Sequence, residues 1–268
     1  MSIRLGIIGG GVMAEAILTR LLASQTYQAK TILVSEPQPQ RRDFLAQTYQ
    51  VSVTSHNQEI LQATESVLLA IKPQVLDQVI AQLTLESLEN YPLILSILAG
   101  VTLERLETAF PNFPVIRVMP NTPATVGAGM TAIAAGNHIN PSHLTVATSI
   151  FAAVGKVVEV PESLMDGVTG LSGSGPAFVA LMIEALSDGG VAAGLPRAIA
   201  AKLALQTVLG TAKLIEETGI HPAQLKDNVT SPGGTTIAGV GKLEEKGFRS
   251  AVIEAVKTAY GRSQELGK

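Results

Sequence analysis

The chain contains no cysteine and no tryptophan, and only 4% of its 268 residues are aromatic. Without cysteine it has no disulfide, no thiolate nucleophile and no Cys-ligated zinc, which is compatible with a reducing compartment. The shortage of aromatic side chains disfavours a surface that stacks sugars or nucleic-acid bases. Charged residues make up 15% of the chain, the formal net charge is −3, and the longest basic cluster is the pair Arg41–Arg42. Binding to nucleic acid or to an anionic membrane is therefore not expected.

Long hydrophobic runs are also missing. The longest uninterrupted apolar tract, Ala177–Ile183, ends at Glu184, so we predict no segment that reaches the roughly 18 residues needed to span a bilayer. The apolar stretch Ile3–Met13 is interrupted by Arg4 and lacks the charged region that opens a signal peptide. Hydrophobic residues nevertheless form 46% of the composition, enough for a sizeable core. We expect a folded cytoplasmic protein with no membrane partner.

The first 160 residues alternate between short β-branched apolar runs and longer amphipathic segments. Continuous apolar runs are typical of parallel strands that are buried on both faces, and the segments between them are typical of crossover helices. We therefore predict an α/β dinucleotide-binding domain over residues 1–160, built on a doubly wound parallel (Rossmann) sheet. The predicted strands are Ile3–Ile8, Thr31–Val34, Val51–Val53, Val67–Ile71, Leu93–Leu98, Val115–Met119, Thr131–Ala134 and Lys156–Val160.

The pattern changes after Pro161, where no convincing strand follows and prolines open three predicted helices, as is favoured at a first turn. The helix predicted at Pro176–Ala193 carries few charges on any face, so we expect a partner subunit to cover it. Burial within its own monomer is the alternative. Residues 161–268 are predicted to form an all-helical substrate-binding and dimerisation domain. Its predicted helices are Pro176–Ala193, Pro196–Glu217, Pro222–Val229, Thr235–Lys246 and Ser250–Leu266.

A glycine-rich turn follows the first predicted strand, at Ile8-Gly9-Gly10-Gly11-Val12-Met13-Ala14. It fits the pattern Gly-x-Gly-x-x-Ala, in which Gly9 permits a tight turn, Gly11 lets the backbone approach a pyrophosphate and Ala14 allows close helix–sheet packing. The phosphates would bind free N–H groups at the helix N-terminus. Because the motif follows a strand and opens a helix, it predicts a dinucleotide site rather than a merely structural turn.

Residues after the second strand favour opposite coenzymes. Glu36 suits the ribose 2′-hydroxyl of NAD(H). Arg41 and Arg42 suit the 2′-phosphate of NADP(H), unless they only form a solvated first turn of the helix. Ser35 can donate a hydrogen bond to either coenzyme. The residues by themselves leave both NADH and NADPH open.

Other familiar sites are not supported. None of the four histidines is paired at i, i+4 spacing around a glutamate, so no metal site is predicted. The segment Gly170–Ser174 comes close to the nucleophile elbow of serine hydrolases, but it ends in serine and follows no predicted strand. Hydride transfer needs neither a metal nor a nucleophile, because the nicotinamide carries the reaction and the protein supplies position and electrostatics.

Two further glycine-rich segments, Leu171–Pro176 and Ser231–Thr236, are predicted to be turns that lead into helices. Each offers hydroxyl groups and exposed amides but no cationic side chain. This combination suits a small carboxylate held by backbone N–H groups. Ordinary N-capping by serine or threonine is the alternative for each segment.

Six motifs can be compared with known families: Gly6–Glu15, Ile71–Pro73, Ala99–Thr102, Arg117–Pro123, Thr169–Pro176 and, most specific, Leu225–Thr236. With these motifs, the sequence resembles the pyrroline-5-carboxylate reductase family over nearly the whole chain. The resemblance implies that 1-pyrroline-5-carboxylate is reduced to L-proline, the last step of proline biosynthesis, by hydride transfer to the ring C=N. It also implies a homodimer that interlocks through the C-terminal helices, dimers often assembled into rings, and NADPH as the coenzyme, with NADH as the second option.

The resemblance also implies site residues. The pyrroline site would be lined by Glu162, Thr235 and Thr236. The amides of Gly233, Gly234 and the two threonines suit the substrate carboxylate, and the catalytic Thr236 hydroxyl suits the imine nitrogen. No histidine or lysine stands out as a proton donor, so we expect the substrate to arrive protonated or to take its proton through Thr236 and water. The cofactor would be lined by Ile8, Gly9, Gly10, Gly11, Val12, Met13, Ser35, Asn57, Ile71, Lys72, Ala99 and Asn228.

Two other functions compete with this interpretation. A reductase of the same architecture that acts on another small imine or on a β-hydroxy acid would typically rely on a lysine in the second domain. Lys202 and Lys213 lie on predicted helices, but neither belongs to a glycine-flanked motif. A non-catalytic dinucleotide-sensing or scaffold protein would keep Gly9–Ala14 but would not need two glycine–hydroxyl segments.

Overall fold

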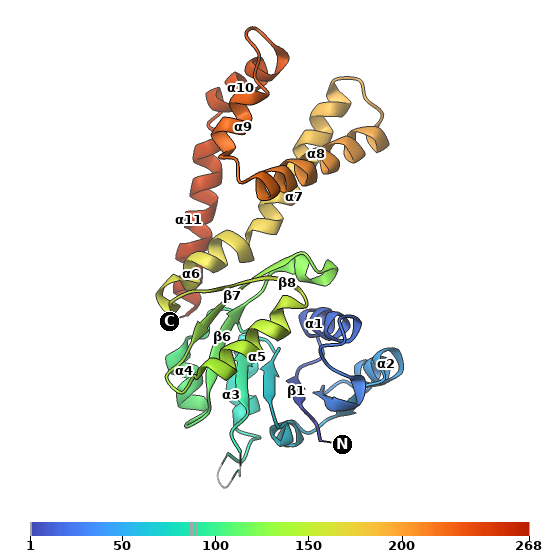
Figure 1. Cartoon of the computed structure of the whole chain (residues 1–268), viewed down its shortest axis with the longest axis vertical. Helices are drawn as coiled ribbons and strands as arrows, with labels where there is room; N and C mark the ends of the chain where they lie inside the picture. The colour runs from blue at the N-terminus through green and yellow to red at the C-terminus, as the bar shows by residue number, and fades with distance from the viewer. Residues whose placement is uncertain (1, 86–87, 89, 268) are drawn as a thin grey trace. The chain divides into compact units, whose positions relative to one another are not determined.

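The computed structural model describes residues 2–85, 88 and 90–267. The chain forms two compact units, one of residues up to Gly173 together with those from Ala259 onward, the other of Ser174–Thr258 (Figure 1). The first unit contains the sheet and the second contains only helices among its described residues. The predicted division at 160/161 follows the end of the last strand. The compact units instead group the short helical segments after that strand, and the end of the last helix, with the sheet.

The sheet of the first unit has the strand order β3-β2-β1-β4-β5-β6-β7-β8. The order reverses at β1, which lies between β2 and β4, and such a reversal opens a crevice at the carboxyl ends of parallel strands. Every predicted strand is present among the described residues. The strands are β1 (Leu5–Ile8), β2 (Ile32–Ser35), β3 (Ser52–Thr54), β4 (Ser66–Leu69), β5 (Leu93–Ser96), β6 (Val115–Met119), β7 (Gly129–Ala135) and β8 (Gly155–Glu159).

One strand pairing departs from the predicted parallel sheet. β7 runs antiparallel to β6, with Val118 opposite Ile133. The connection between the two strands holds only the short 3-10 helix η4 (Thr122–Val126), which is too short for a crossover between parallel neighbours. The chain therefore turns back on itself, and β8 lies parallel to β7 after the helix α5 (Pro141–Ala152).

Helices cover both faces of the sheet, which confirms the doubly wound α/β domain. Ile17, Leu21 and Phe151 are buried on one face, and Phe110 and Phe113 on the other. The first face is covered by α1 (Val12–Ala23), α2 (Pro39–Tyr49) and α5, and the second by η2 (Asn57–Gln62), α3 (Leu76–Ile80), α4 (Leu103–Ala109) and α6 (Met165–Val168).

The prediction of a glycine turn at Leu171–Pro176 is wrong. Residues Thr169–Gly173 form a π-helical segment, η6, that runs into the helix α7 (Gly175–Ala192). Tertiary contacts stabilise this helical path in spite of its glycines. A Cβ at Gly173 would lie 2.7 Å from Met119 Cε, and Asn121 Nδ2 donates a hydrogen bond to the Ser172 carbonyl at 3.1 Å. Single π-helical turns of this kind are frequent at functional sites.

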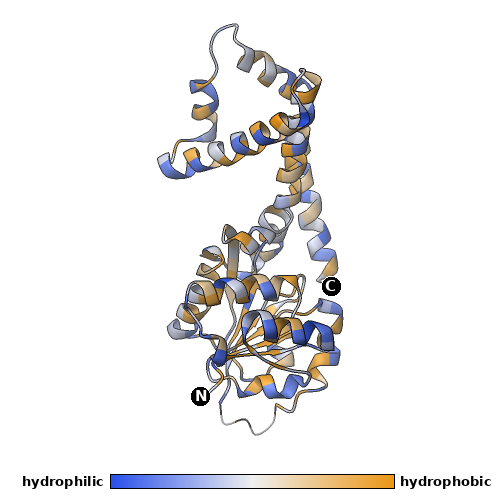
Figure 2. Cartoon of the chain, turned by 90° about the vertical axis from the view of Figure 1, so that its right-hand side faces the viewer, coloured by the Kyte–Doolittle hydropathy of each residue, from blue (hydrophilic) through white to orange (hydrophobic). Residues whose placement is uncertain are grey.

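The helices of the second unit contain many apolar residues (Figure 2), and much of their apolar surface is exposed. α7 packs against α8 closely enough that a Cβ at Gly190 would lie 3.0 Å from Ala200 Cβ. Leu181 on α7 is nevertheless 66% exposed and Leu209 on α8 is 58% exposed. The alternative in which the monomer itself buries α7 is therefore wrong. The remaining helices are α8 (Arg197–Thr218), α9 (Pro222–Asn228), α10 (Thr235–Glu245) and α11 (Phe248–Leu266).

Two helical segments correct our expectation about membrane-spanning length. Residues Glu162–Ala192 and Arg197–Thr218 are long and apolar enough to cross a membrane by length and composition. Neither segment is one uninterrupted apolar run, but small residues keep the mean hydropathy of these helices high between their few charges. Both segments fall in the region whose apolar faces a partner subunit is expected to cover.

Candidate functional site

The turn after β1 has glycine at two consecutive positions, and the first of them requires it. Gly9 has a φ of +99°, its N–H donates to the Ser35 carbonyl at 2.8 Å, and a Cβ there would lie 2.5 Å from the Ala70 carbonyl oxygen. A Cβ at Gly10 would lie 2.6 Å from Leu45 Cδ1. Glycine at position 9 therefore lets the chain leave β1 between the ends of β2 and β4, whereas a side chain at position 10 would require Leu45 to shift.

Gly11 is constrained differently. It is the N-cap of α1, with φ −72° and ψ −174°, a backbone conformation that any residue can adopt. A Cβ at Gly11 would meet no described atom within 4 Å. No side chain caps this helix, so the first N–H groups after Gly11, including those of Val12 and Met13, are available to a ligand. Open space beside uncapped amides fits the pyrophosphate of a dinucleotide.

Glu36, directly after β2, makes hydrogen bonds that stabilise this turn. Its carboxylate accepts a hydrogen bond from Gly10 N–H at 2.9 Å and another from Gln38 N–H at 3.0 Å, and the residue is only 8% exposed. Arg42 donates to the Glu36 carbonyl at 2.7 Å, and Arg41 Nε donates to the Gly10 carbonyl at 2.6 Å. Both arginines are thus bonded to the backbone that surrounds the turn.

Glu15 on α1 holds Arg41 beside the glycine turn. Tyr49 donates its hydroxyl hydrogen to Glu15 Oε1 at 2.6 Å, and Arg41 Nη2 donates to Glu15 Oε2. The hydrogen bond from Tyr49, assisted by Arg41, holds the pKa of Glu15 below its usual value, while burial raises the pKa of Tyr49. Glu15 is therefore ionised at neutral pH and keeps its ion pair with Arg41.

Two predicted cofactor residues contact each other at the same edge of the sheet. Ser35 Oγ donates to Asn57 Oδ1 at 2.7 Å, and Asn57 Nδ2 donates to Gln82 Oε1 at 2.7 Å. Asn228, by contrast, belongs to the second unit, where its Oδ1 accepts from Gln224 Nε2 at 2.9 Å. The other predicted cofactor residues of the first unit follow the carboxyl ends of β4 and β5: Ile71, Lys72 and Ala99.

In the second unit, the predicted turn before α10 is present. Gly233 has a φ of +68°, and the N–H of Gly234 donates to the Ser231 carbonyl at 3.1 Å, so this amide is not available to a substrate. Gly234 is the N-cap of α10 and provides no side-chain cap. Thr235 and Thr236 open the helix, and within the described chain neither hydroxyl makes a hydrogen bond. Capping by these threonines is therefore not observed, and their first-turn amides are free of helical partners.

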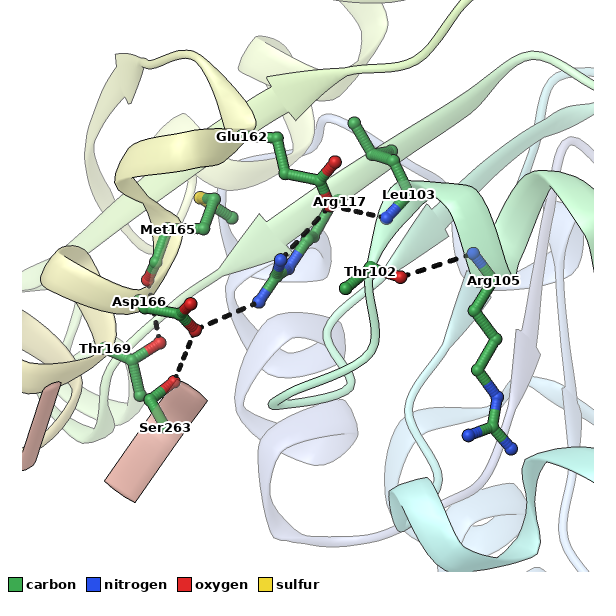
Figure 3. Close-up of polar contacts among 9 residues, drawn as sticks. All are labelled: Thr102, Leu103, Arg105, Arg117, Glu162, Met165, Asp166, Thr169 and Ser263. Carbon is green, nitrogen blue, oxygen red and sulfur yellow. Dashed lines mark hydrogen bonds and ion pairs between the residues drawn. The ribbon is translucent and has the colours of Figure 1, made fainter. Parts of the chain in front are cut away.

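Glu162 lies in a polar network that the sequence did not reveal (Figure 3). It opens the 3-10 helix η5 (Glu162–Leu164), and its Oε1 accepts from Leu103 N–H at 2.5 Å and from Arg117 Nη1 at 3.2 Å. In the sequence, Arg117 is predicted only as part of the family motif Arg117–Pro123. A stronger signal was present, namely a charged residue in the middle of the apolar strand Val115–Met119.

Comparison with known proteins accounts for both parts of the chain. The family model described as pyrroline-5-carboxylate reductase dimerisation matches residues 162–266, and the one described as NADP oxidoreductase, coenzyme F420-dependent, matches residues 4–100. The pyrroline-5-carboxylate reductase of Synechocystis is 68% identical over the whole of both chains. That of Escherichia coli is 42% identical, again over the whole of both chains.

Solved structures agree with the sequence comparison. A pyrroline-5-carboxylate reductase from Coxiella burnetii has a TM-score of 0.90 at 35% identity and covers 100% of both chains. The Plasmodium falciparum pyrroline carboxylate reductase, with NADP bound, has a TM-score of 0.88 at 30% identity and covers 99% of this chain and 98% of that chain. With its glycine turn, its helical C-terminal region and these full-length matches, the chain belongs to the pyrroline-5-carboxylate reductase family.

Proposed function

We propose that this protein reduces 1-pyrroline-5-carboxylate to L-proline with NADPH, the last step of proline biosynthesis. The full-length match to the Synechocystis enzyme at 68% identity carries the proposal. The uncapped amides and the open space at Gly11 support a dinucleotide at the end of β1. The bound coenzyme supplies the hydride that is added to the carbon of the ring C=N.

In this proposal the residues of the chain bind the coenzyme and the substrate, orient them, and polarise the ring C=N. The first-turn amides of α1 bind the pyrophosphate, and Ser35 and Asn57 hydrogen-bond the adenosine half of the coenzyme. The amides of Thr235 and Thr236 hold the substrate carboxylate. The Thr236 hydroxyl hydrogen-bonds the ring nitrogen, which becomes a better hydride acceptor when it is protonated. The proton is carried by the incoming substrate or reaches the nitrogen through Thr236 and water.

One assay separates this function from its competitors. NADPH oxidation is followed with 1-pyrroline-5-carboxylate, with hydroxypyruvate and without substrate. We expect turnover with the first compound alone. Turnover with hydroxypyruvate would instead indicate a β-hydroxyacid dehydrogenase, and no turnover with either compound would indicate a binding protein.

Coenzyme choice should respond to the charge of Glu36. We expect a higher kcat/KM for NADPH than for NADH in the parent enzyme. Glu36→Gln should increase the ratio of the two values several-fold, because it removes a negative charge beside the predicted 2′-phosphate position while an amide oxygen can still accept from Gly10 N–H. The exposed Glu104→Gln on α4 is the matched control. A large preference for NADH in the parent would show that the carboxylate dominates.

The chain should be a dimer in solution. Residues 161–268 are proposed as the dimerisation and substrate-binding domain, and the exposed leucines of α7 and α8 need a partner. Sedimentation at micromolar concentration should give twice the chain mass of 27.9 kDa or a whole multiple of that dimer mass. Leu209→Glu should weaken this association. A well-folded monomer of the parent chain would contradict the idea.

Two finer points extend the proposal. We place the enzyme in the cytoplasm, a reducing compartment that is compatible with the cysteine-free sequence. We also propose that dimers assemble into rings, as the resemblance implies. The same sedimentation experiment reports rings as whole multiples of the dimer mass, and a single dimeric species at all concentrations would exclude them.

A further inference from the structure

Arg117 is a buried charge in an apolar strand. It is the third residue of β6, its neighbours Ile116 and Val118 are buried, and Arg117 itself is only 5% exposed. β6 lies between β5 and β7, so it has no free edge. Burying a guanidinium costs free energy, and apolar replacements of buried ion pairs are often neutral or stabilising. Stability alone therefore does not account for an arginine at this position.

The partners of Arg117 lie on the chain that follows β8. Its Nη1 is 3.2 Å from Glu162 Oε1, and its Nη2 is 3.9 Å from Asp166 Oδ1 (Figure 3). The carboxylates are four residues apart, so successive turns present both to one planar guanidinium. Asp166 Oδ1 also accepts from Ser263 Oγ at 2.7 Å, and Ser263, near the end of α11, is buried.

Glu162 is held from a second direction as well. Its Oε1 accepts from the N–H of Leu103, which opens α4 directly after the N-cap Thr102. The loop before this helix contains Ala99, one of the predicted cofactor residues. Both contacts use Oε1, so Oε2 takes part in neither of them. The two carboxylates and the one guanidinium together carry a net charge of −1. This net negative charge suits a cationic nitrogen nearby.

We propose that Arg117 is a positioning residue that fixes the carboxylate of Glu162 for the cationic ring nitrogen of the substrate, an inference that rests on the proposed function. Arg117 is too buried to touch the substrate and acts through Glu162. Without the guanidinium, the carboxylates of Glu162 and Asp166 would repel each other. The Glu162 carboxylate would then lose its fixed orientation and the positive charge that partly neutralises it. The effect should therefore fall on binding of pyrroline-5-carboxylate and L-proline rather than on binding of NADPH.

The test compares Arg117→Met, Arg117→Lys, Glu162→Gln and the combinations of each Arg117 variant with Glu162→Gln. The KM values for pyrroline-5-carboxylate and NADPH are measured with the Kd of L-proline by calorimetry and the Tm. Arg117→Met should raise the KM for pyrroline-5-carboxylate and the Kd of L-proline by about 10-fold or more. The KM for NADPH should stay within about twofold. Arg117→Lys should give KM and Kd values between those of the parent and of Arg117→Met, because an ammonium restores the charge but not the planar geometry of the guanidinium.

The matched control is Arg105→Met, which removes an exposed arginine whose Nη2 is 3.0 Å from Asp77 and should leave all four values unchanged. Combining an Arg117 variant with Glu162→Gln should be no worse than Glu162→Gln alone. Fully additive effects, or a lower Tm with an unchanged KM, would overturn the proposal. If Arg117→Met does not fold, the same comparison of KM, Kd and additivity is made with Arg117→Lys and with its combination with Glu162→Gln. An inactive parent enzyme that also fails to bind L-proline would contradict the proposed function itself.

Discussion

Gly11→Val is expected to abolish NADPH binding in a protein that remains folded. The backbone at Gly11 already has φ and ψ values that valine adopts, and a Cβ there meets no described atom within 4 Å. The new side chain would instead fill the space in front of the uncapped first turn of α1, where the pyrophosphate is proposed to bind. Titration of NADPH fluorescence should show no saturable binding, while the Tm stays close to that of the parent.

Gly9→Ala provides the contrasting variant. Gly9 has a φ of +99° and its Cβ would lie 2.5 Å from the Ala70 carbonyl oxygen, so even one methyl group strains the backbone. We expect this variant to lose Tm, because β1 must shift relative to β4. If Gly11→Val bound NADPH as tightly as the parent enzyme, the coenzyme would not lie at this turn.

Thr236→Val should lower kcat/KM for pyrroline-5-carboxylate by about 5- to 150-fold, which corresponds to roughly 1–3 kcal/mol for one hydrogen bond in the transition state. Valine keeps the shape of threonine and removes only the hydroxyl that is proposed to contact the ring nitrogen. The loss should appear in turnover more than in the affinity for NADPH, whose glycine turn belongs to the other unit. Steady-state kinetics with both substrates checks this split.

Thr235→Val is the matched control for Thr236→Val. Since Gly234 is the N-cap of α10 and neither threonine hydroxyl makes a hydrogen bond in the described chain, neither variant should lose much Tm. Thr235→Val should retain most of its activity if Thr235 contributes chiefly its backbone amide. Equal losses of Tm with normal kinetics would mean that the threonines only support the helix. A stable and fully active Thr236→Val enzyme would remove this hydroxyl from the mechanism.

Local patterns predicted the strands, the glycine turn and the helical C-terminal region. Each depends on hydrophobic periodicity, or on a turn that only glycine can form, as at Gly9. The features that were missed depend on contacts distant in sequence. The direction of β7 follows from the short connection after β6, and the π-helical turn at Thr169–Gly173 receives a hydrogen bond from Asn121 that no local pattern predicts.

The same distinction between local patterns and contacts distant in sequence applies to the candidate site. The turn at Gly9–Gly11 and the helix start that follows it could be predicted because they are local to one strand and one helix. The contact of Arg117 with Glu162 joins residues that are far apart in the chain, and no local spacing predicts it. The carboxylate of Glu36 illustrates the intermediate case. Its place at the end of β2 was predictable, but its hydrogen bond to Gly10 N–H was not.

The first compact unit is not continuous in sequence, and this affects the order in which a ribosome can complete it. Asp166 accepts a hydrogen bond from Ser263, and Gly100 lies against Leu266, so closely that a Cβ at Gly100 would be 3.4 Å from the Leu266 carbonyl oxygen. Both contacts therefore use residues that are synthesised after the helical unit. Domains generally fold in the order in which they emerge. A nascent chain that ends before α11 therefore lacks these contacts, and the sheet unit is finished only after the helical unit has been made.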